Sequence, residues 1–518
     1  MPICDSCLKA DLSAQCQYGT EHMKTPSIRF LEERIQDLEA SLRSLGPHNG
    51  TGNYTSMAPL VANAYKRAES LAVLHPLSDP YVDTWTHREP VPTNIRNELI
   101  QAFIKLRWQF AFEFNVPRFM ASLDLPPSHP NAPHPAFLYA ILLHGCFYTT
   151  TALRRYEHVF YKRMRKELAI SLASADRLLD FIRASALGAV YFFAKARYAQ
   201  GHNYLSTVMK FAIACGLHRI ESVSADTPFH LLPVCADLAE LGDRINTFWT
   251  LVHGDWIGSL VCGKFPYSLS ESEVTTVWPC PSEYYEGGRY LHQPEGNLAS
   301  LHDLNSIVVP TRRDNYLALR AKGVALLHRA SILSAQARKS TIISETLRLD
   351  IVSALLSTSQ FATTLPPFSA RAEEYDDPDA VRSILAVAIV ATHATMVQLY
   401  HILAGSDPLS RERQSKAANA ALTIMKELET VKFQYMPVLI GWSVTPVHEF
   451  LLREKARFAQ SGDTEELERT QGELDRLDRT LRRVAELYPR TDIAAAQADI
   501  IQTSFRSFGL DECAACFF

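Results

Sequence analysis

Three cysteines near the start of the chain have a spacing that suits a metal ion. Two residues separate Cys4 from Cys7, and eight more precede Cys16. Thiolates held this close together are ligands for a soft tetrahedral ion, which is usually zinc. Three thiols leave such a site one ligand short, so His22 or another group would have to complete it. The spacing leaves two interpretations open, a zinc site and a chance arrangement.

A heptad repeat follows these cysteines, within residues 27–45. Its a and d positions hold only isoleucine and leucine: Ile28, Leu31, Ile35, Leu38, Leu42 and Leu45. Isoleucine-rich a positions with leucine at d favour a parallel two-stranded coiled coil, in which Arg34 would face Glu39 across the seam. An amphipathic helix that packs on its own protein is the alternative. We expect a dimerisation helix, which would make the protein a homodimer.

The overall charge is nearly balanced, so it gives no sign of a surface that binds nucleic acid or anionic membrane. The 518 residues include 52 Lys and Arg against 56 Asp and Glu, for a formal net charge of −4. A strongly basic balance marks surfaces for nucleic acid or anionic membrane, and this chain lacks it. The chain opens without the basic start and apolar core of a signal peptide, so we expect reduced thiols in the cytosol or nucleus.

No arrangement of residues in the sequence indicates catalysis. There is no P-loop, no glycine-rich dinucleotide turn after a strand and no nucleophile elbow. Six cations lie between residues 154 and 166. Such a run suits nuclear import or phosphate binding, but it is more often the solvated face of a helix. We therefore expect a protein that is not an enzyme, and no DNA-binding residue can be assigned.

Helical periodicity dominates the chain from residue 93 to residue 505. Residues 46–92 are predicted to be a linker, 263–311 an irregular loop and 506–518 a C-terminal tail. Thr227-Pro228 and Asp377-Pro378 have the residue types of helix starts. The predicted helices cover 95–113, 136–170, 175–199, 202–215, 228–262, 312–338, 342–363, 379–404, 410–431, 436–459, 464–487 and 491–505. The sequence thus predicts an all-α fold, with one multi-helix domain over 93–505.

One predicted helix is apolar enough to raise the question of a membrane. Residues 383–406 carry no formal charge, and 384–404 are mostly apolar, which is long enough to span a bilayer. The segment also contains polar side chains, among them Thr392, His393 and Gln398. We expect a buried helix of a large bundle and no membrane partner.

Two stretches of the helical part have distinctive patterns. In residues 204–219 an apolar stripe at helical spacing is followed by Gly216 and Leu217, which suit a left-handed helix end. The stripe consists of Leu205, Val208, Met209, Ala212 and Cys215. The second stretch has Phe248-Trp249, then Asp255, then Gly263-Lys264-Phe265-Pro266.

Taken in order, these features resemble the fungal binuclear zinc-cluster transcription regulators. Residues 2–18 are similar to the second half of the family's six-cysteine cluster, and a coiled coil follows the cluster in the family. The two helical stretches resemble its middle homology region, although Phe265 is an insertion. The resemblance implies an all-helical regulatory domain over 93–505 and a partial zinc cluster in 1–22, with zinc on Cys4, Cys7 and Cys16. It also implies DNA as a partner, nuclear localisation and regulation of RNA polymerase II genes.

The sequence departs from the family where the family reads DNA. The family cluster begins with an earlier half, rich in Lys and Arg, that contacts bases in the major groove. Here Met1 stands just ahead of Cys4, which matches the fourth family cysteine. Residues 1–50 have five basic against seven acidic side chains, the wrong sign for phosphate contacts. We expect a transcription regulator whose DNA-reading half-cluster is missing from this chain.

Two other functions stay open at this point. One is a regulatory or dominant-negative dimerising protein that has the same helical body and does not bind DNA. The other, from a different class, is an all-α enzyme or membrane-associated protein whose N-terminal resemblance is accidental.

Overall fold

The described part of the chain consists of helices joined by turns and loops. The computed structural model describes residues 86, 90–149, 151–195, 197–224, 229–262, 271–292, 296–302, 314–339, 342–368, 378–404, 407–429 and 439–486. They all lie in one compact unit that begins at Pro80. Within these ranges there are α-helices and short 3-10 helices but no strand. The predicted all-α class is confirmed, whereas the predicted segments 1–22, 27–45 and 506–518 lie outside the described residues.

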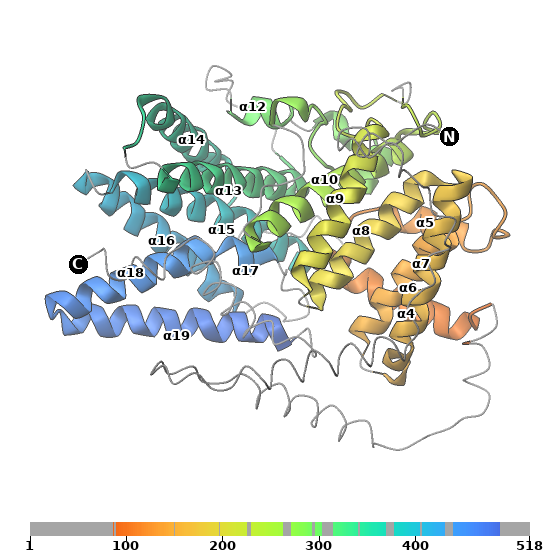
Figure 1. Ribbon diagram of the computed structural model, residues 1–518, viewed down its shortest axis with the longest axis horizontal. Helices are drawn as coiled ribbons and strands as arrows, with labels where there is room; N and C mark the ends of the chain where they lie inside the picture. Colours follow the sequence, from red (N-terminus) through yellow and green to blue (C-terminus); the bar gives the residue numbers. More distant parts are fainter. Residues whose placement is uncertain are drawn as a thin grey trace, which may run out of the picture. The chain divides into compact units, whose positions relative to one another are not determined.

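The first group of helices ends with α9 and surrounds α6 (Figure 1). It consists of α4 (Thr93–Leu106), η3 (Arg107–Phe110), α5 (Val116–Ser122), α6 (Pro135–Tyr148), η4 (Ala152–Tyr156), α7 (Glu157–Ser174), α8 (Leu178–Ala194) and α9 (Tyr198–Ala214). Helix α6 packs on α4, α7 and α8, and α8 packs on α9. Because neighbours cover it on several sides, α6 is apolar along almost its whole length and mostly buried.

A second group follows the long helix α10 (Leu238–Cys262). It consists of η5 (Glu271–Glu273), α11 (Ser282–Glu286), η6 (Arg289–His292), α12 (Leu298–His302), α13 (Tyr316–Lys339), α14 (Glu345–Thr364), α15 (Pro378–Leu403), α16 (Pro408–Leu428), α17 (Leu439–Ser443), α18 (Thr445–Ser461) and α19 (Thr464–Glu486). Helix α15 contacts α13, α14, α16, α17 and α18.

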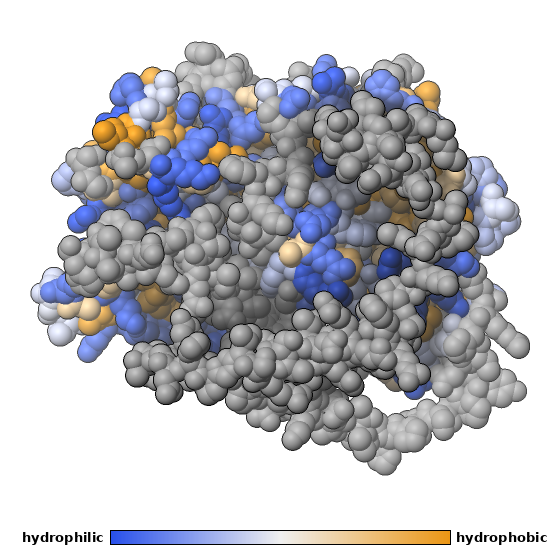
Figure 2. All heavy atoms as spheres, viewed as in Figure 1, coloured by the Kyte–Doolittle hydropathy of each residue, from blue (hydrophilic) through white to orange (hydrophobic). Residues whose placement is uncertain are grey.

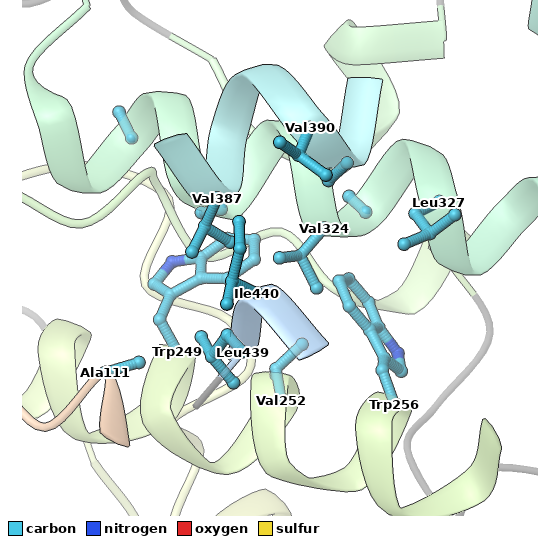
Figure 3. Close-up of a cluster of buried hydrophobic side chains, with 14 of the residues drawn as sticks. Ala111, Trp249, Val252, Trp256, Val324, Leu327, Val387, Val390, Leu439 and Ile440 are labelled. Carbon is cyan, nitrogen blue, oxygen red and sulfur yellow. The ribbon is translucent and has the colours of Figure 1, made fainter. Parts of the chain in front are cut away.

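Helix α10 connects the two groups, because it contacts α8 and α9 as well as α13. The later turns of α10 enter an apolar cluster with α13, α15 and α17 (Figure 3), whose labelled members include Trp249, Val252, Trp256, Val324, Leu327, Val387, Val390, Leu439 and Ile440. The ring of Trp249 stacks on Trp278 at 4.7 Å between centroids. Its indole N–H donates to the carbonyl oxygen of Val277 at 2.7 Å. This cluster holds the two groups of helices together.

Helix α15 is the segment that raised the question of a membrane. Among the described helices it alone is long and apolar enough to cross a bilayer, and 83% of its apolar window is buried inside the protein. Gly323 of α13 lies so close to it that an added Cβ would come within 2.8 Å of the Ala388 carbonyl oxygen. The predicted buried helix is therefore confirmed.

The end of α9 agrees with the sequence in detail. All five apolar residues of the predicted stripe are buried. Gly216 has a φ of 85°, and Leu217 donates its backbone N–H to the carbonyl oxygen of Ala212 at 3.1 Å. Leu217 is itself fully buried. This is the left-handed helix end that Gly216 and Leu217 predict.

Several predicted helix boundaries are wrong. The helix predicted over 228–262 begins at Leu238, because the carboxylate of Asp237 accepts the backbone N–H of Glu240 at 2.9 Å and caps the new start. The helix predicted over 136–170 is interrupted after Tyr148, where the Thr151 hydroxyl accepts the N–H of Leu153 and starts η4. These side chains compete with the helix for backbone groups.

Two further predictions need correction. The helix predicted over 175–199 ends at Ala194, and α9 begins at Tyr198. The loop predicted over 263–311 contains α11 and α12 within its described residues. No described residue tests the helix predicted over 491–505.

Helix α14 exposes apolar side chains on one face. Figure 2 shows hydrophobic residues gathered where α14 lies in Figure 1. Leu349, Val352 and Leu356, spaced three and four residues apart, are exposed by 60%, 40% and 53%. Side chains at this spacing share one face of a helix.

Candidate functional site

A cavity with charged walls lies between α5, α8, α10 and the segment that leads into α10. Its volume is about 530 Å³, which is within the range of small-molecule sites. The charged side chains that line it are Arg118, Asp176, Arg177, Asp180, Arg183, Glu240, Asp243 and Arg244. Three of them, Arg183, Asp243 and Arg244, are buried.

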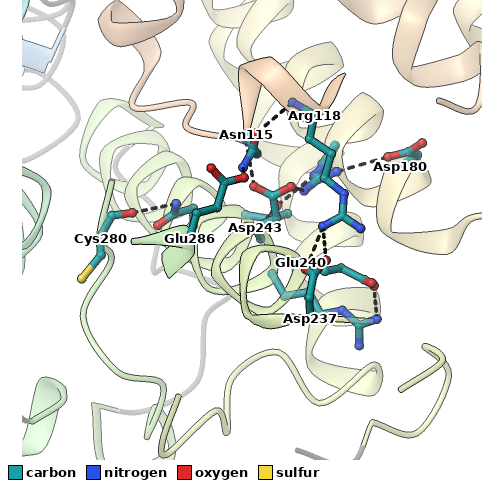
Figure 4. A network of polar contacts seen from close by, with 12 residues as sticks. Asn115, Arg118, Asp180, Asp237, Glu240, Asp243, Cys280 and Glu286 are labelled. Carbon is teal, nitrogen blue, oxygen red and sulfur yellow. Dashed lines mark hydrogen bonds and ion pairs between the residues drawn. The ribbon is translucent and has the colours of Figure 1, made fainter. Parts of the chain in front are cut away.

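The centre of the network is Arg183, which projects from the apolar helix α8. Its Nη2 lies 2.8 Å from Oδ2 of Asp243, and its Nη1 lies 3.3 Å from Oδ1 of Asp180. Its Nε donates to the Thr247 hydroxyl at 3.3 Å. Figure 4 shows this network and its extension to α5 and α10. A buried guanidinium needs such partners, because an unpaired one would be very unfavourable.

The two carboxylates beside Arg183 also accept backbone hydrogen bonds. Asp243 accepts the N–H of Asn115 at 2.9 Å, and Asp180 accepts the N–H of His134 at 2.8 Å. Burial raises the pKa of both carboxyl groups, and the positive charge of Arg183 opposes that shift. The positive charge of Arg183 therefore favours the ionised form of Asp180 and Asp243, whose carboxyl groups would otherwise hold their protons more strongly.

Asn115 connects three helices at one wall of the cavity. Its side-chain oxygen accepts the N–H of Arg118 at 2.9 Å and caps α5. Its side-chain amide donates to Oε1 of Glu286 in α11 at 2.6 Å, while its backbone N–H reaches Asp243 in α10. These contacts hold the start of α5 against α10 and α11.

A salt bridge joins α5 to the start of α10 at the surface. Arg118 Nη1 lies 2.7 and 2.8 Å from the two carboxylate oxygens of Asp237. Both side chains are substantially exposed, at 42% and 51%. Exposed pairs of this kind contribute only about 0–1 kcal/mol, so this one positions the two elements more than it stabilises them.

Arg244 is the least satisfied charged side chain of the cavity. It is 1% exposed, and its guanidinium carbon lies 4.3 Å from the ring centroid of Phe229. Its Nη2 donates to Oε1 of Glu240 at 2.5 Å. Its Nε and Nη1 are buried and have no hydrogen-bond partner in the described part of the chain. Arg244 thus keeps two donors for which these residues supply no acceptor.

Apolar side chains border the same cavity. Leu231 and Val234 line it and are exposed by 51% and 69%, although both are large hydrophobic residues. Phe119 and Leu179 also line it. The cavity therefore combines three buried charged side chains with two exposed apolar ones, and the part lined by Leu231 and Val234 is its mouth.

The backbone beside the cavity is strained at two positions. Ala175 and Arg177 have φ values of 51° and 45°, in the left-handed region that residues with a Cβ seldom adopt. Both line the cavity. Strained backbone is found most often at functional sites, which agrees with a functional role for this cavity.

The site residues predicted from the sequence lie elsewhere in the chain. Cys4, Cys7 and Cys16 and the heptad residues Ile28, Leu31, Ile35, Leu38, Leu42 and Leu45 are outside the described residues. The zinc site and the dimer helix therefore stay predictions.

The cysteines that the structure describes do not form a metal centre with other described residues. Cys146, Cys215, Cys235 and Cys280 are free and buried. Burial raises the pKa of the Cys215 and Cys235 thiols to about 11, so neither is a thiolate at neutral pH. Among the described residues no group of three or more His, Cys, Asp or Glu side chains could hold a metal ion.

Sequence reasoning missed the charged network. The sequence does show one sign of this network, because charged residues such as Arg183 in α8 interrupt otherwise apolar helical patterns. Asp243 lies in the second turn of α10, which begins at Leu238. Its role is to pair with Arg183, which is 60 residues away in the chain, a distance that no local pattern spans.

Comparison with known proteins gives one finding for this part of the chain. Residues 103–297 match the family model described as the fungal specific transcription factor domain. No curated protein and no solved structure matches the chain. The matched segment includes α5, α8 and α10, and with them the cavity. It confirms the resemblance to that domain for residues 103–297, while the zinc-cluster part of the resemblance stays a prediction.

Proposed function

We propose that this protein is a fungal transcription regulator that acts in the nucleus on RNA polymerase II genes. The observation that carries the proposal is the match of residues 103–297 to the fungal specific transcription factor domain. The helical body is the regulatory part, and the cavity within the matched segment is where a regulatory signal would enter. The matched domain is named for transcription factors, which supports the proposal that this protein is not an enzyme.

The N-terminal part supplies zinc binding and dimerisation in this proposal. Cys4, Cys7 and Cys16 bind zinc, supported by their spacing, and residues 27–45 form a parallel coiled coil between two copies, supported by the heptad. DNA is the partner expected of a zinc-cluster regulator.

Tethering the protein to a promoter tests regulation separately from DNA recognition. The full chain would be fused to an unrelated DNA-binding module in a fungal host that carries a reporter gene with the cognate sites. We expect the fusion to change the reporter transcript, upward or downward, relative to the module alone. A nuclear fusion that leaves the transcript at the level of the module alone would overturn the proposal.

Two single substitutions test the dimer. Leu38→Asp places a charge in the seam, and the buried charge would cost several kcal/mol, roughly more than three heptads can offset. Ala40→Asp adds the same charge at an outer position and serves as the control. Sedimentation should show a dimer for the native chain and for Ala40→Asp, and a monomer for Leu38→Asp. A native monomer would contradict the dimer.

Metal analysis tests the zinc ligands. Cys7→Ser should lower the zinc content of the purified chain, whereas Ser6→Ala, one residue away, should not. Equal zinc content in both variants would remove Cys7 from the site.

A dimerising regulator that does not itself contact DNA is the second candidate. The excess of acidic over basic residues in 1–50 favours it, because phosphate contacts require the opposite sign. A DNA titration at several salt concentrations separates the two. Tight binding with a steep salt dependence supports a direct DNA contact, and weak binding without sequence preference supports the second candidate.

A further inference from the structure

The cavity between α5, α8 and α10 has unequal numbers of spare donors and spare acceptors. Asp180, Asp243 and Glu240 each pair with an arginine and also accept a backbone N–H, from His134, Asn115 and Ala236. Asp176 pairs with Arg177 at 2.7 Å. The carboxylates of the cavity are therefore already engaged.

The spare capacity lies on the donor side, at Arg244. Its Nε and Nη1 are buried without a hydrogen-bond partner in the described residues, although Arg244 lines the cavity. A buried donor without an acceptor is unfavourable, and a charged donor more so. A ligand that brings an anionic acceptor would remove this deficit with a charge-assisted hydrogen bond. A cationic ligand would meet only carboxylates that are already paired.

The apolar side chains at the mouth of the cavity indicate the chemistry of the rest of the ligand. Leu231 and Val234 are mostly exposed, and Phe119 and Leu179 also line the cavity. A hydrocarbon or aromatic group placed here would cover apolar surface that otherwise faces water. The volume of about 530 Å³ admits a molecule of the size of a small metabolite.

We propose that this cavity binds a small organic carboxylate, with Arg244 holding the carboxylate and Leu231 and Val234 covering its apolar part. The role of that ligand as an effector of transcription rests on the proposed function; its binding does not.

Calorimetry on the purified full chain tests the binding with matched probes. The probes are 4-phenylbutanoate and octanoate, each compared with the amine of the same skeleton, 4-phenylbutylamine and octylamine. We expect at least one carboxylate to bind saturably and its amine counterpart not to bind. Failure of both carboxylates, or equal binding of carboxylate and amine, would overturn the proposal.

Three variants locate the site. Arg244→Gln should weaken carboxylate binding by about 10-fold or more, the loss expected for a charged hydrogen bond. Val234→Glu adds a negative charge at the exposed mouth and should weaken it by about fivefold. The control is Leu349→Glu, the same kind of change at a similarly exposed position on α14, which should leave binding unchanged.

The variant at the mouth keeps the test valid if Arg244→Gln does not fold. Val234 is 69% exposed, so Val234→Glu should fold as the native chain does. Native affinity in Val234→Glu would show that the carboxylate binds elsewhere and would overturn the assignment. The assay contains no DNA, so its failure leaves the reporter result standing, and a silent reporter leaves the binding result standing.

Discussion

The first and the later turns of α10 differ in the contacts that predominate around them. The first turns carry Asp243 and Arg244, which are buried beside other charged groups. The later turns carry Trp249 and Trp256, which are buried among apolar side chains of α13, α15 and α17. In the charged end each donor and acceptor needs a partner, and Arg244 is short of two. The later turns also bury His253 and Asp255, and Oδ1 of Asp255 lies 3.3 Å from Nε2 of His202. Their contacts with α13, α15 and α17 are nevertheless mainly apolar, so we expect the burial of apolar surface to dominate stability at this end.

The largest expected effect is at the apolar end. Trp249→Ala removes a buried ring that stacks on Trp278 and should lower the free energy of unfolding by about 4 kcal/mol. Denaturant unfolding followed by circular dichroism measures it. A loss below about 1 kcal/mol, the size of a typical substitution, would contradict the view that this end stabilises the domain.

The charged end should respond somewhat less to the loss of one carboxylate. Asp243→Ala leaves Asp180 as the one carboxylate beside Arg183 among the described residues, and we expect a loss of about 3 kcal/mol in the free energy of unfolding. The double variant Arg183→Ala/Asp243→Ala should cost less than the sum of its two single variants, since each single change strands a charge. Additivity within this pair would show that the two charges are not coupled.

A pH titration sharpens the comparison at Glu113, whose pKa depends first on burial and then on the charges of Arg107, Glu283, Arg320 and Asp243. Burial raises the pKa of this carboxyl group to about 7. Between its usual pKa of 4.5 and this value the folded state holds a proton that the unfolded state releases, so stability falls as pH rises. From pH 5 to pH 7 the native protein should lose about 2 kcal/mol more than Glu113→Gln does. Parallel stability curves for the two proteins would contradict the raised pKa.

The smallest expected effect is a gain in stability beside the cavity. Ala175 is exposed with a φ of 51°, so Ala175→Gly should stabilise the fold by about 0.5 kcal/mol by relieving the left-handed backbone. Ala173→Gly, an exposed position inside α7, is the matched control and should destabilise by up to about 1 kcal/mol. Thermal unfolding of both variants measures the difference. A loss of stability in both would mean that the backbone at Ala175 is not strained.

Local chemistry explains which parts of the fold the sequence predicts. Gly216 and Leu217 end α9 as expected because the cap depends on residues within one turn. The start of α10 was predicted ten residues too early, because Thr227-Pro228 has the same residue types as a helix start. The cap that the structure uses, Asp237, is equally local, but the sequence offers no rule for choosing between the two.

The cavity depends on long-range pairing, which sequence periodicity does not report. Arg183 meets Asp243, and Asn115 meets Glu286, across 60 and 171 residues. The charges themselves are visible as interruptions of apolar patterns, but their partners become known only when the helices are packed. The cysteines and the heptad are local motifs that the sequence reveals readily, although they lie outside the described residues.

Helix α10 extends without interruption from the cavity to the contacts with α13. Its 25 residues form one uninterrupted helix, a rod about 37 Å long at 1.5 Å per residue. The guanidinium of Arg244 is near one end of this rod, and the ring of Trp256 is in its far half, stacked on His328 of α13. A shift of α10 at the cavity would therefore be expected to change its contacts with α13. The fluorescence of the tryptophans along it would report such a movement without any added label.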